Sequence, residues 1–143
     1  MKQLEEIMMK KIYIILTCLH FFVGVGAIFG GIGVIIDSSG KGYGITTDIL
    51  KYGPFNDFLI PGLILFIFLG IIGLITAVFS LKYYQYQAYL SGIMGVGLIV
   101  FITVQCMVLN GIHYLHVIFF VIGLLETILA ITLAFKKKLN PFK

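Results

Sequence analysis

A glutamate inside a long apolar stretch is the residue of this chain best placed to do chemistry. Glu126 lies ten residues before Lys136, near the middle of an apolar run. An ionisable side chain at that depth costs at least a few kcal/mol on insertion scales, so it normally faces a partner or a water-filled cavity. His20 is the expected partner because it lies nine residues after Lys11. At 1.5 Å per helical residue, both side chains lie roughly 13 to 15 Å deep from the same boundary.

Three further polar residues complete the candidate ligand-binding or proton-binding site. Thr17 and Thr127 are expected to donate hydrogen bonds around the pair, and Gln105 lies in the outer half of a third apolar run. Two interpretations stay open. The pair either ties two helices together, or it serves as a proton relay or as the counter-charge for a cationic or hydrogen-bonding ligand.

The elements that position these residues are apolar helices. The chain has 143 residues, of which 60% are hydrophobic and 11% are charged, and its mean hydropathy is +1.10. About 20 helical residues cross a bilayer core of roughly 30 Å. Four runs have this length, at residues 12–36, 60–81, 90–109 and 114–135. They are apolar on every face, which favours helices over the alternating strands of a β-barrel.

The predicted fold is an all-α, polytopic membrane protein in which four transmembrane helices form an antiparallel bundle. Residues 1–143 make one integral membrane domain, with cytoplasmic tails at 1–11 and 136–143. The connection at 37–59 is external. It is expected to lie on the outer interface as a lid, because its apolar residues have nowhere else to be buried. Its glycines leave a mobile loop as the alternative.

Lysine placement predicts the orientation of the bundle. Every positive charge is a lysine, and eight lysines flank one side of a four-span topology, against two on the other: Lys2, Lys10, Lys11, Lys82, Lys136, Lys137, Lys138 and Lys143 against Lys41 and Lys51. Positive residues stay inside, so both termini are expected in the cytoplasm. The minimal loops are typical of a bacterial inner-membrane protein. The absence of arginine weighs against nucleic-acid binding.

Small residues recur at three- and four-residue spacing on each span. The stripes include Gly24 and Gly31 on the first run, Gly70 and Gly73 on the second, and Gly95 on the third. Such residues let helix backbones approach closely in lipid. They predict contacts within the bundle, and they also offer a surface for a second copy or for a partner membrane protein.

Metal and cofactor sites are not expected. His113 and His116 are three residues apart near the outer end of the fourth run, but no tight spacing links them to the acidic residues of the long loop. Cys18 and Cys106 lie in different apolar runs, which excludes a local dithiol or thiolate zinc site. The sequence predicts no metal and no cofactor, and it does not indicate which small-molecule ligand, if any, the chain binds.

Three classes of function remain. A non-enzymatic accessory or interaction bundle fits the lack of a catalytic constellation, and lipid-exposed glycine stripes would support it. A small transporter-like or ligand-binding bundle built around His20 and Glu126 is the alternative, and an internal cavity of ligand size would support that. An enzyme is the least supported class, because no nucleophile or metal set completes the pair.

Overall fold

The computed structural model describes residues 1–139, and the expected tail at residues 140–143 lies outside this range. Residues 1–139 contain helices and connecting turns but no strand, which confirms the all-α prediction. The elements in chain order are α1 (Lys2–Ile36), the 3₁₀ helices η1 (Lys41–Tyr43) and η2 (Thr47–Tyr52), α2 (Leu59–Ile64), the π-helix η3 (Leu65–Ile72), α3 (Gly73–Leu81), α4 (Gln87–Val108) and α5 (Tyr114–Leu139).

Four helical segments of the described chain are long and apolar enough to cross a membrane, as the sequence predicts. They cover Lys2–Ile36, Leu59–Leu81, Gln87–Val108 and Tyr114–Lys137. The largest difference from expectation is at the start. Residues 2–11, expected as a tail, form the first turns of α1, because lysine, glutamate, leucine and methionine are all strong helix formers. Residues 136–139 likewise continue α5.

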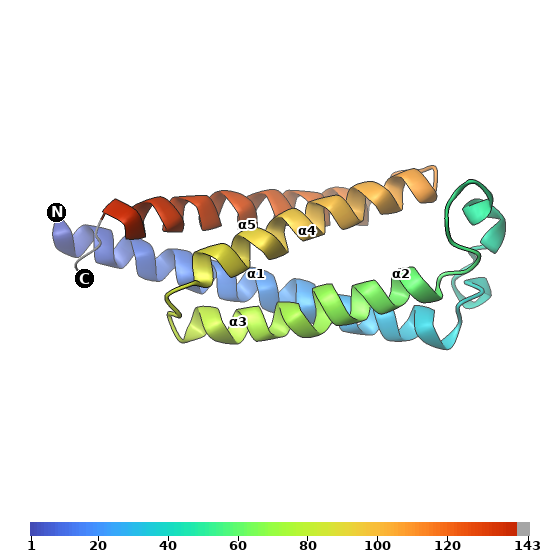
Figure 1. Ribbon diagram of the computed structural model, residues 1–143, viewed down its shortest axis with the longest axis horizontal. Coiled ribbons are helices and arrows are strands. Elements are labelled where there is room, and N and C mark those ends of the chain that lie inside the picture. Colours follow the sequence, from blue (N-terminus) through green and yellow to red (C-terminus); the bar gives the residue numbers. More distant parts are fainter. Residues whose placement is uncertain (140–143) are drawn as a thin grey trace.

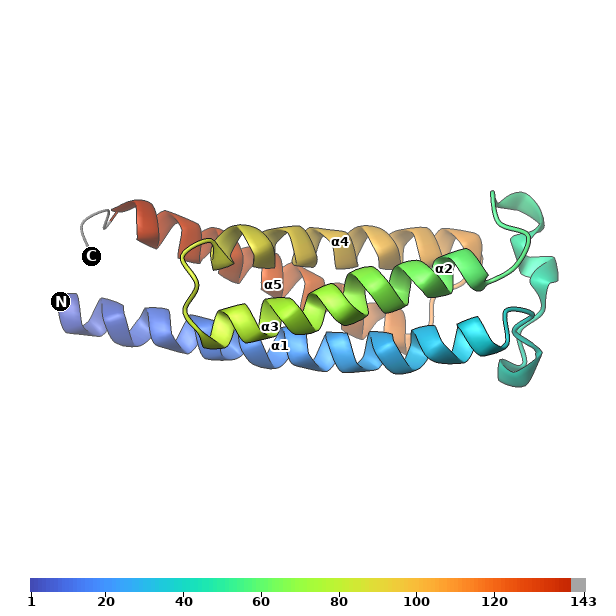
Figure 2. The same cartoon turned by 60° about the horizontal axis from the view of Figure 1, so that its bottom comes forward.

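The bundle consists of two antiparallel helical hairpins. One hairpin pairs α1 with the continuous segment α2–η3–α3, and the other pairs α4 with α5 across a short turn. Packing is most extensive within each hairpin and sparser between the two. Both termini lie at one end of the bundle, called here the terminal end, and the connection at 37–58 lies at the opposite loop end (Figures 1 and 2).

Two apolar clusters form the core. The cluster nearer the loop end contains Val23, Ala27, Leu69, Met94, Leu98 and Ile102. The cluster nearer the terminal end contains Ile12, Tyr13, Leu16, Ala88 and Leu133. On α1, His20 falls between Leu16 and Val23, so a polar position separates the two clusters.

The glycine stripes are used inside the bundle. A Cβ atom at Gly31 would lie 2.9 Å from the backbone N and Cα of Phe66, so glycine alone permits this approach of α1 to η3. A Cβ atom at Gly95 would lie 2.8 Å from the backbone N of Thr127, where α4 meets α5. These glycines serve intramolecular packing and leave no room at the same positions for a helix from another chain.

The second span contains a π-helix. Pro61 stands in the first turn of α2, where its missing N–H has no helical partner to lose. The chain then follows i→i+5 geometry over Leu65–Ile72 before α3 resumes regular α geometry. Such a stretch holds more residues per turn than the α-helix around it, and π segments often occur near functional sites.

The connection at 37–58 is folded back on itself at the loop end. The carboxylate of Asp37 accepts hydrogen bonds from the Ser39 hydroxyl and from the backbone N–H of Gly42, the latter at 2.7 Å. The backbone N–H of Phe58 donates to the carbonyl oxygen of Ser38 at 3.0 Å, and Leu50 is only 2% exposed. These contacts give the connection a defined structure.

Replacing Asp37 with asparagine is expected to speed tryptic cleavage after Lys41 several-fold at neutral pH. The Ser39 hydroxyl and the Gly42 N–H lower the pKa of Asp37 from its ordinary value of 3.8. A lowered folded pKa gives a contribution that is complete above the unfolded pKa and is lost as the pH falls through the folded value. The contribution of Asp37 to loop order should therefore be present at neutral pH and be lost as the pH falls below the ordinary pKa of 3.8. Asp48→Asn, with the same charge loss, is the control, and equal cleavage of both variants would contradict the prediction.

Candidate functional site

A chain of four buried polar side chains links three helices. His20 Nδ1 of α1 lies 3.1 Å from Glu126 Oε1 of α5. On the other side of the imidazole, Nε2 lies 2.9 Å from the hydroxyl oxygen of Ser91 on α4. Gln87, one turn earlier on α4, donates from its amide Nε2 to the same oxygen at 2.8 Å. All four residues are at most 1% exposed.

One assignment of hydrogens satisfies this chain in a single direction. The Ser91 oxygen accepts from Gln87 and has one proton of its own, which it donates to Nε2 of His20. The imidazole proton then sits on Nδ1 and faces the Glu126 carboxylate. In this assignment the hydrogen bond from Ser91 to Nε2 goes with the tautomer of His20 that carries its proton on Nδ1, because a hydrogen bond to one ring nitrogen sets the state of the other.

The contact between His20 and Glu126 is an electrostatic approach more than an aligned hydrogen bond. The 3.1 Å separation of Nδ1 and Oε1 lies within hydrogen-bond range. However, Glu126 Oε1 accepts no hydrogen bond of good geometry, and Gln87 Oε1 also lacks a partner among the described residues. Gln87 Oε1 and Glu126 Oε1 lie at the two ends of this series of polar side chains, and burying them without a hydrogen-bond partner costs folding free energy.

Gly95 lets Glu126 reach its place beside α4. The Cβ that any other residue would carry there lies 3.0 Å from Glu126 Cβ and 2.6 Å from Thr127 Oγ1. Glycine at position 95 therefore leaves the space on α4 that the Glu126 side chain of α5 needs. His20 reaches the same level from α1, because it lies on the inward face with Val23 and Gly24.

The other predicted site residues do not join the chain. Thr17 Oγ1 donates to the carbonyl oxygen of Tyr13 and Thr127 Oγ1 to that of Gly123, both at 2.8 Å and both within their own helices. Gln105 lies further toward the loop end, on the wall of a separate cavity. The sequence predicts equal depth for His20 and Glu126. It also predicts hydrogen bonds from Thr17 and Thr127 to this pair, whereas in the structure both hydroxyls donate to carbonyl oxygens of their own helices.

Ser91 and Gln87 are the site residues that sequence reasoning misses. Ser91 lies one helical turn before Gly95, and a small residue at that spacing is expected to serve packing alone. Gln87 lies before residue 90, where that span is expected to start. In the structure α4 begins three residues earlier than expected, so Gln87 is part of the helix. The available signal is their four-residue spacing, which puts both polar side chains on one helix face.

Ser91, His20 and Glu126 stand in the order of hydroxyl, imidazole and carboxylate that activates a serine in hydrolases. Here Ser91 is fully buried, and it lines neither the cavity near Gln105 nor the one near Lys136. A nucleophile needs space for a reacting atom about 3 Å away. The three groups connect α4, α1 and α5 in the interior of the bundle.

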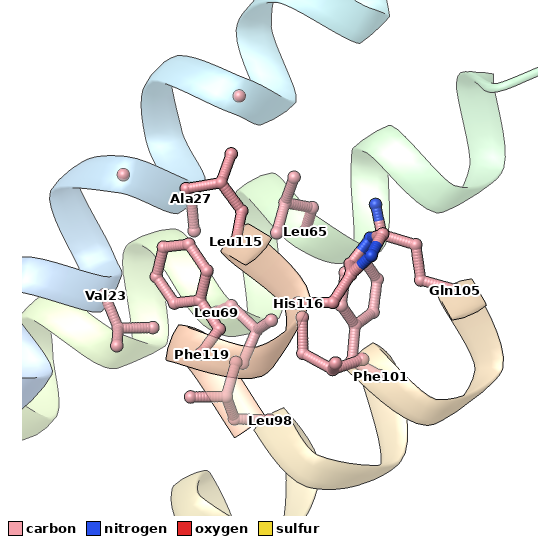
Figure 3. A pocket seen from close by; sticks show the side chains of 13 residues that line it. Val23, Ala27, Leu65, Leu69, Leu98, Phe101, Gln105, Leu115, His116 and Phe119 are labelled. Carbon is pink, nitrogen blue, oxygen red and sulfur yellow. The ribbon is translucent and has the colours of Figure 1, made fainter. Parts of the chain in front are cut away.

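A cavity of about 210 Å³ lies between the two hairpins, toward the loop end from the polar chain. Its walls are mostly apolar and come from α1, η3, α4 and α5, including Val23, Ala27, Leu69, Leu98 and Phe119 (Figure 3). Gly26 and Gly30 line it on α1 and are exposed, so the cavity opens sideways between α1 and α5. The hairpins meet at the polar chain and separate around this space.

Gln105 and His116 are the polar side chains of the cavity wall, and Figure 3 shows them on the same side of it. His116 is 7% exposed, and its Nδ1 accepts a hydrogen bond from the backbone N–H of His113 at 3.0 Å. That bond leaves Nε2 of the ring as the nitrogen for another partner. No group of three or more metal-ligating side chains occurs within the described part of the chain.

The geometry therefore divides the interior into a sealed polar chain and an open apolar cavity with two polar groups. Comparisons with known protein families, with curated proteins and with solved structures find no match to this chain.

Proposed function

We propose that this chain is a non-enzymatic membrane protein that binds a lipid-like molecule between its two helical hairpins. The observation that carries the proposal is the cavity of about 210 Å³ with apolar walls and with Gln105 and His116 on one side. The positive-inside rule supports an orientation with both termini in the cytoplasm, and the minimal loops support a bacterial cytoplasmic membrane. In that orientation the cavity would lie in the outer leaflet.

The size and lining of the cavity define the ligand. An apolar cavity of roughly 150 Å³ is enough to take up benzene, whereas drug-sized ligands fill about 300–1,000 Å³. A space of about 210 Å³ therefore holds one ring or a segment of one chain. The rest of the molecule extends through the lateral opening at Gly26 and Gly30. An apolar body with a hydrogen-bonding head group matches apolar walls with a glutamine and an imidazole.

The distribution of small residues favours ligand binding over an accessory role. An interaction subunit would present its glycine stripes to lipid, where a partner helix would cover them. Gly31 and Gly95 instead pack against Phe66 and Thr127 of the same chain. The exposed Gly26 and Gly30 line the opening of the cavity. An association through other surfaces, with a second copy or with another membrane protein, stays the second proposal.

The buried polar chain has a supporting role in this proposal. It joins α1 of one hairpin to α4 and α5 of the other. A fixed contact at that level lets the hairpins separate toward the loop end without the bundle coming apart. His20 and Glu126 would then set the position of the cavity floor and would not touch the ligand.

Replacing Gly26 with leucine is expected to reduce labelling of the cavity several-fold. A Cβ at Gly26 meets only Phe119 Cζ at 3.8 Å, so the larger side chain is accommodated and occupies the cavity. The probe is a palmitic acid analogue with a diazirine near its carboxyl group, added to purified protein in detergent. Peptide mass spectrometry should locate the crosslinks on the α4 and α5 walls, at Phe101–Gln105 and Leu115–Phe119.

The matched control is Gly92→Leu, at a glycine outside the cavity whose Cβ would meet only Ala130 Cβ at 3.8 Å. It should leave the labelling unchanged. Labelling spread evenly over the lipid-facing surfaces of the wild type, or unaffected by Gly26→Leu, would exclude the cavity as a ligand site.

A further inference from the structure

A second cavity lies at the terminal end of the bundle, separate from the proposed ligand site. Its volume is about 290 Å³. Side chains from α1, from the α3–α4 turn and from the end of α5 line it: Glu6, Met9, Lys10, Tyr13, Tyr83, Lys136 and Lys137. Three elements that are distant in sequence therefore build one enclosure.

The lining carries an excess of positive charge. Among the described residues it contains three lysines and one glutamate. Ammonium groups held around one enclosure repel each other, and a bound anion removes that repulsion. The excess of positive charge therefore favours the binding of an anionic group.

The walls are held in place by contacts on the turn. Lys137 Nζ donates to the carbonyl oxygens of Tyr84 and Gln85 at 3.2 and 2.7 Å and lies 5.4 Å from the centroid of the Tyr13 ring. The Tyr13 and Tyr83 rings meet edge to face with centroids 5.0 Å apart. An ammonium group has three N–H donors. Two of those of Lys137 are used by the turn, so one is left for a ligand.

We propose that this cavity binds the phosphate group of an anionic phospholipid. Lys10 and Lys136 supply charge from two sides, the remaining donor of Lys137 supplies a fixed contact, and the tyrosine hydroxyls offer further donors to phosphate oxygens. Basic pockets between transmembrane helices at the cytoplasmic side recognise anionic head groups in this way. The site goes beyond the proposed ligand cavity and does not depend on it.

A phospholipid suits the place better than a free anion. The enclosure lies where α1 and α5 pass from apolar residues to lysines, which is the level of the lipid head groups in a membrane. An acyl chain attached to the phosphate can lie along exposed apolar residues of α1 such as Ile14. Inorganic phosphate has the same charged oxygens without this second contact.

The test is the melting temperature of the purified protein in a neutral detergent with added lipid. Phosphatidylglycerol is expected to raise Tm by several degrees, whereas phosphatidylcholine and inorganic phosphate at the same concentration leave it unchanged. Lys10→Gln combined with Lys136→Gln should abolish the shift. Lys2→Gln combined with Lys82→Gln removes the same charge at the same end, outside the lining, and should retain it.

Native mass spectrometry gives a readout that does not depend on stability. The wild type and the Lys2/Lys82 control should each retain phosphatidylglycerol, and the Lys10/Lys136 variant should lose it. Equal retention by both double variants would overturn the site. A full shift from inorganic phosphate alone, or an equal one from phosphatidylcholine, would overturn its assignment to an anionic lipid.

Discussion

Replacing His20 with alanine is expected to lower the free energy of unfolding by about 1–3 kcal/mol for each of the two buried polar groups that it leaves without a partner. The variant leaves Glu126 without its imidazole and Ser91 without its acceptor, and both residues are at most 1% exposed. Thermal or denaturant unfolding in detergent measures the loss. Thr17→Val is the control on the same helix, because the Thr17 hydroxyl bonds only to the carbonyl oxygen of Tyr13.

A double-mutant cycle with Glu126→Gln separates the pair from its surroundings. The coupling energy between positions 20 and 126 should be about 0.6 to 2 kcal/mol, the range for polar contacts between helices in lipid. It is smaller than the single loss because the single loss also includes the contact of the imidazole with Ser91. Unchanged stability in both single variants would mean that an expensive acid is kept for another purpose, and a search for proton movement should follow.

Gly95→Ala is expected to destabilise the bundle by about 1–3 kcal/mol, the usual cost of overpacking a close-fitting interior. The added Cβ would lie 2.8 Å from the backbone N of Thr127 and 3.0 Å from Glu126 Cβ. Backbone atoms of α5 would have to move, and the move would also disturb the approach of Glu126 to His20. Unfolding in detergent measures the loss of stability.

Gly92→Ala is the matched control, three residues earlier on the same helix. Its Cβ would lie 3.8 Å from Ala130 Cβ, which is ordinary van der Waals contact. Its effect should stay within about 1 kcal/mol, and the better helix propensity of alanine favours a small gain. If the two variants behave alike, the close contact of α4 and α5 at Gly95 is not needed for stability.

The sequence predicts the parts of the fold that follow from length and hydropathy. Four runs of about 20 apolar residues leave only helices as spanning elements, and the structure has four such helices. The start of α1 is predicted poorly. The lysines and glutamates of residues 2–11 have the low hydropathy of a solvated tail. However, both residue types favour the α-helix, and the span that follows already provides the helical nucleus that they extend.

The sequence predicts the depth of the candidate site residues in the membrane but not which side chains contact one another. Counting residues from the lysine boundaries brings His20 and Glu126 to one level, where the structure puts them 3.1 Å apart. Depth says nothing of rotation about each helix axis, so the contributions of Ser91 and Gln87 cannot be obtained by counting. The cavity is a similar case, because it arises from how two hairpins diverge and not from any one residue.

The π-helix of the second span makes this region tolerant of a change in its length. Eight residues, Leu65–Ile72, follow the wider winding between α2 and α3. A π turn takes up more residues than an α turn, so the loss of one residue here is absorbed by a return to α-helical winding. The same deletion within α3, before Ser80, would turn the rest of that helix by about 100°. Ser80, whose hydroxyl donates to the Tyr13 carbonyl oxygen, would then face away from α1. Among natural variants of this chain, single-residue deletions in the second span should therefore fall within residues 65–72 and not within α3.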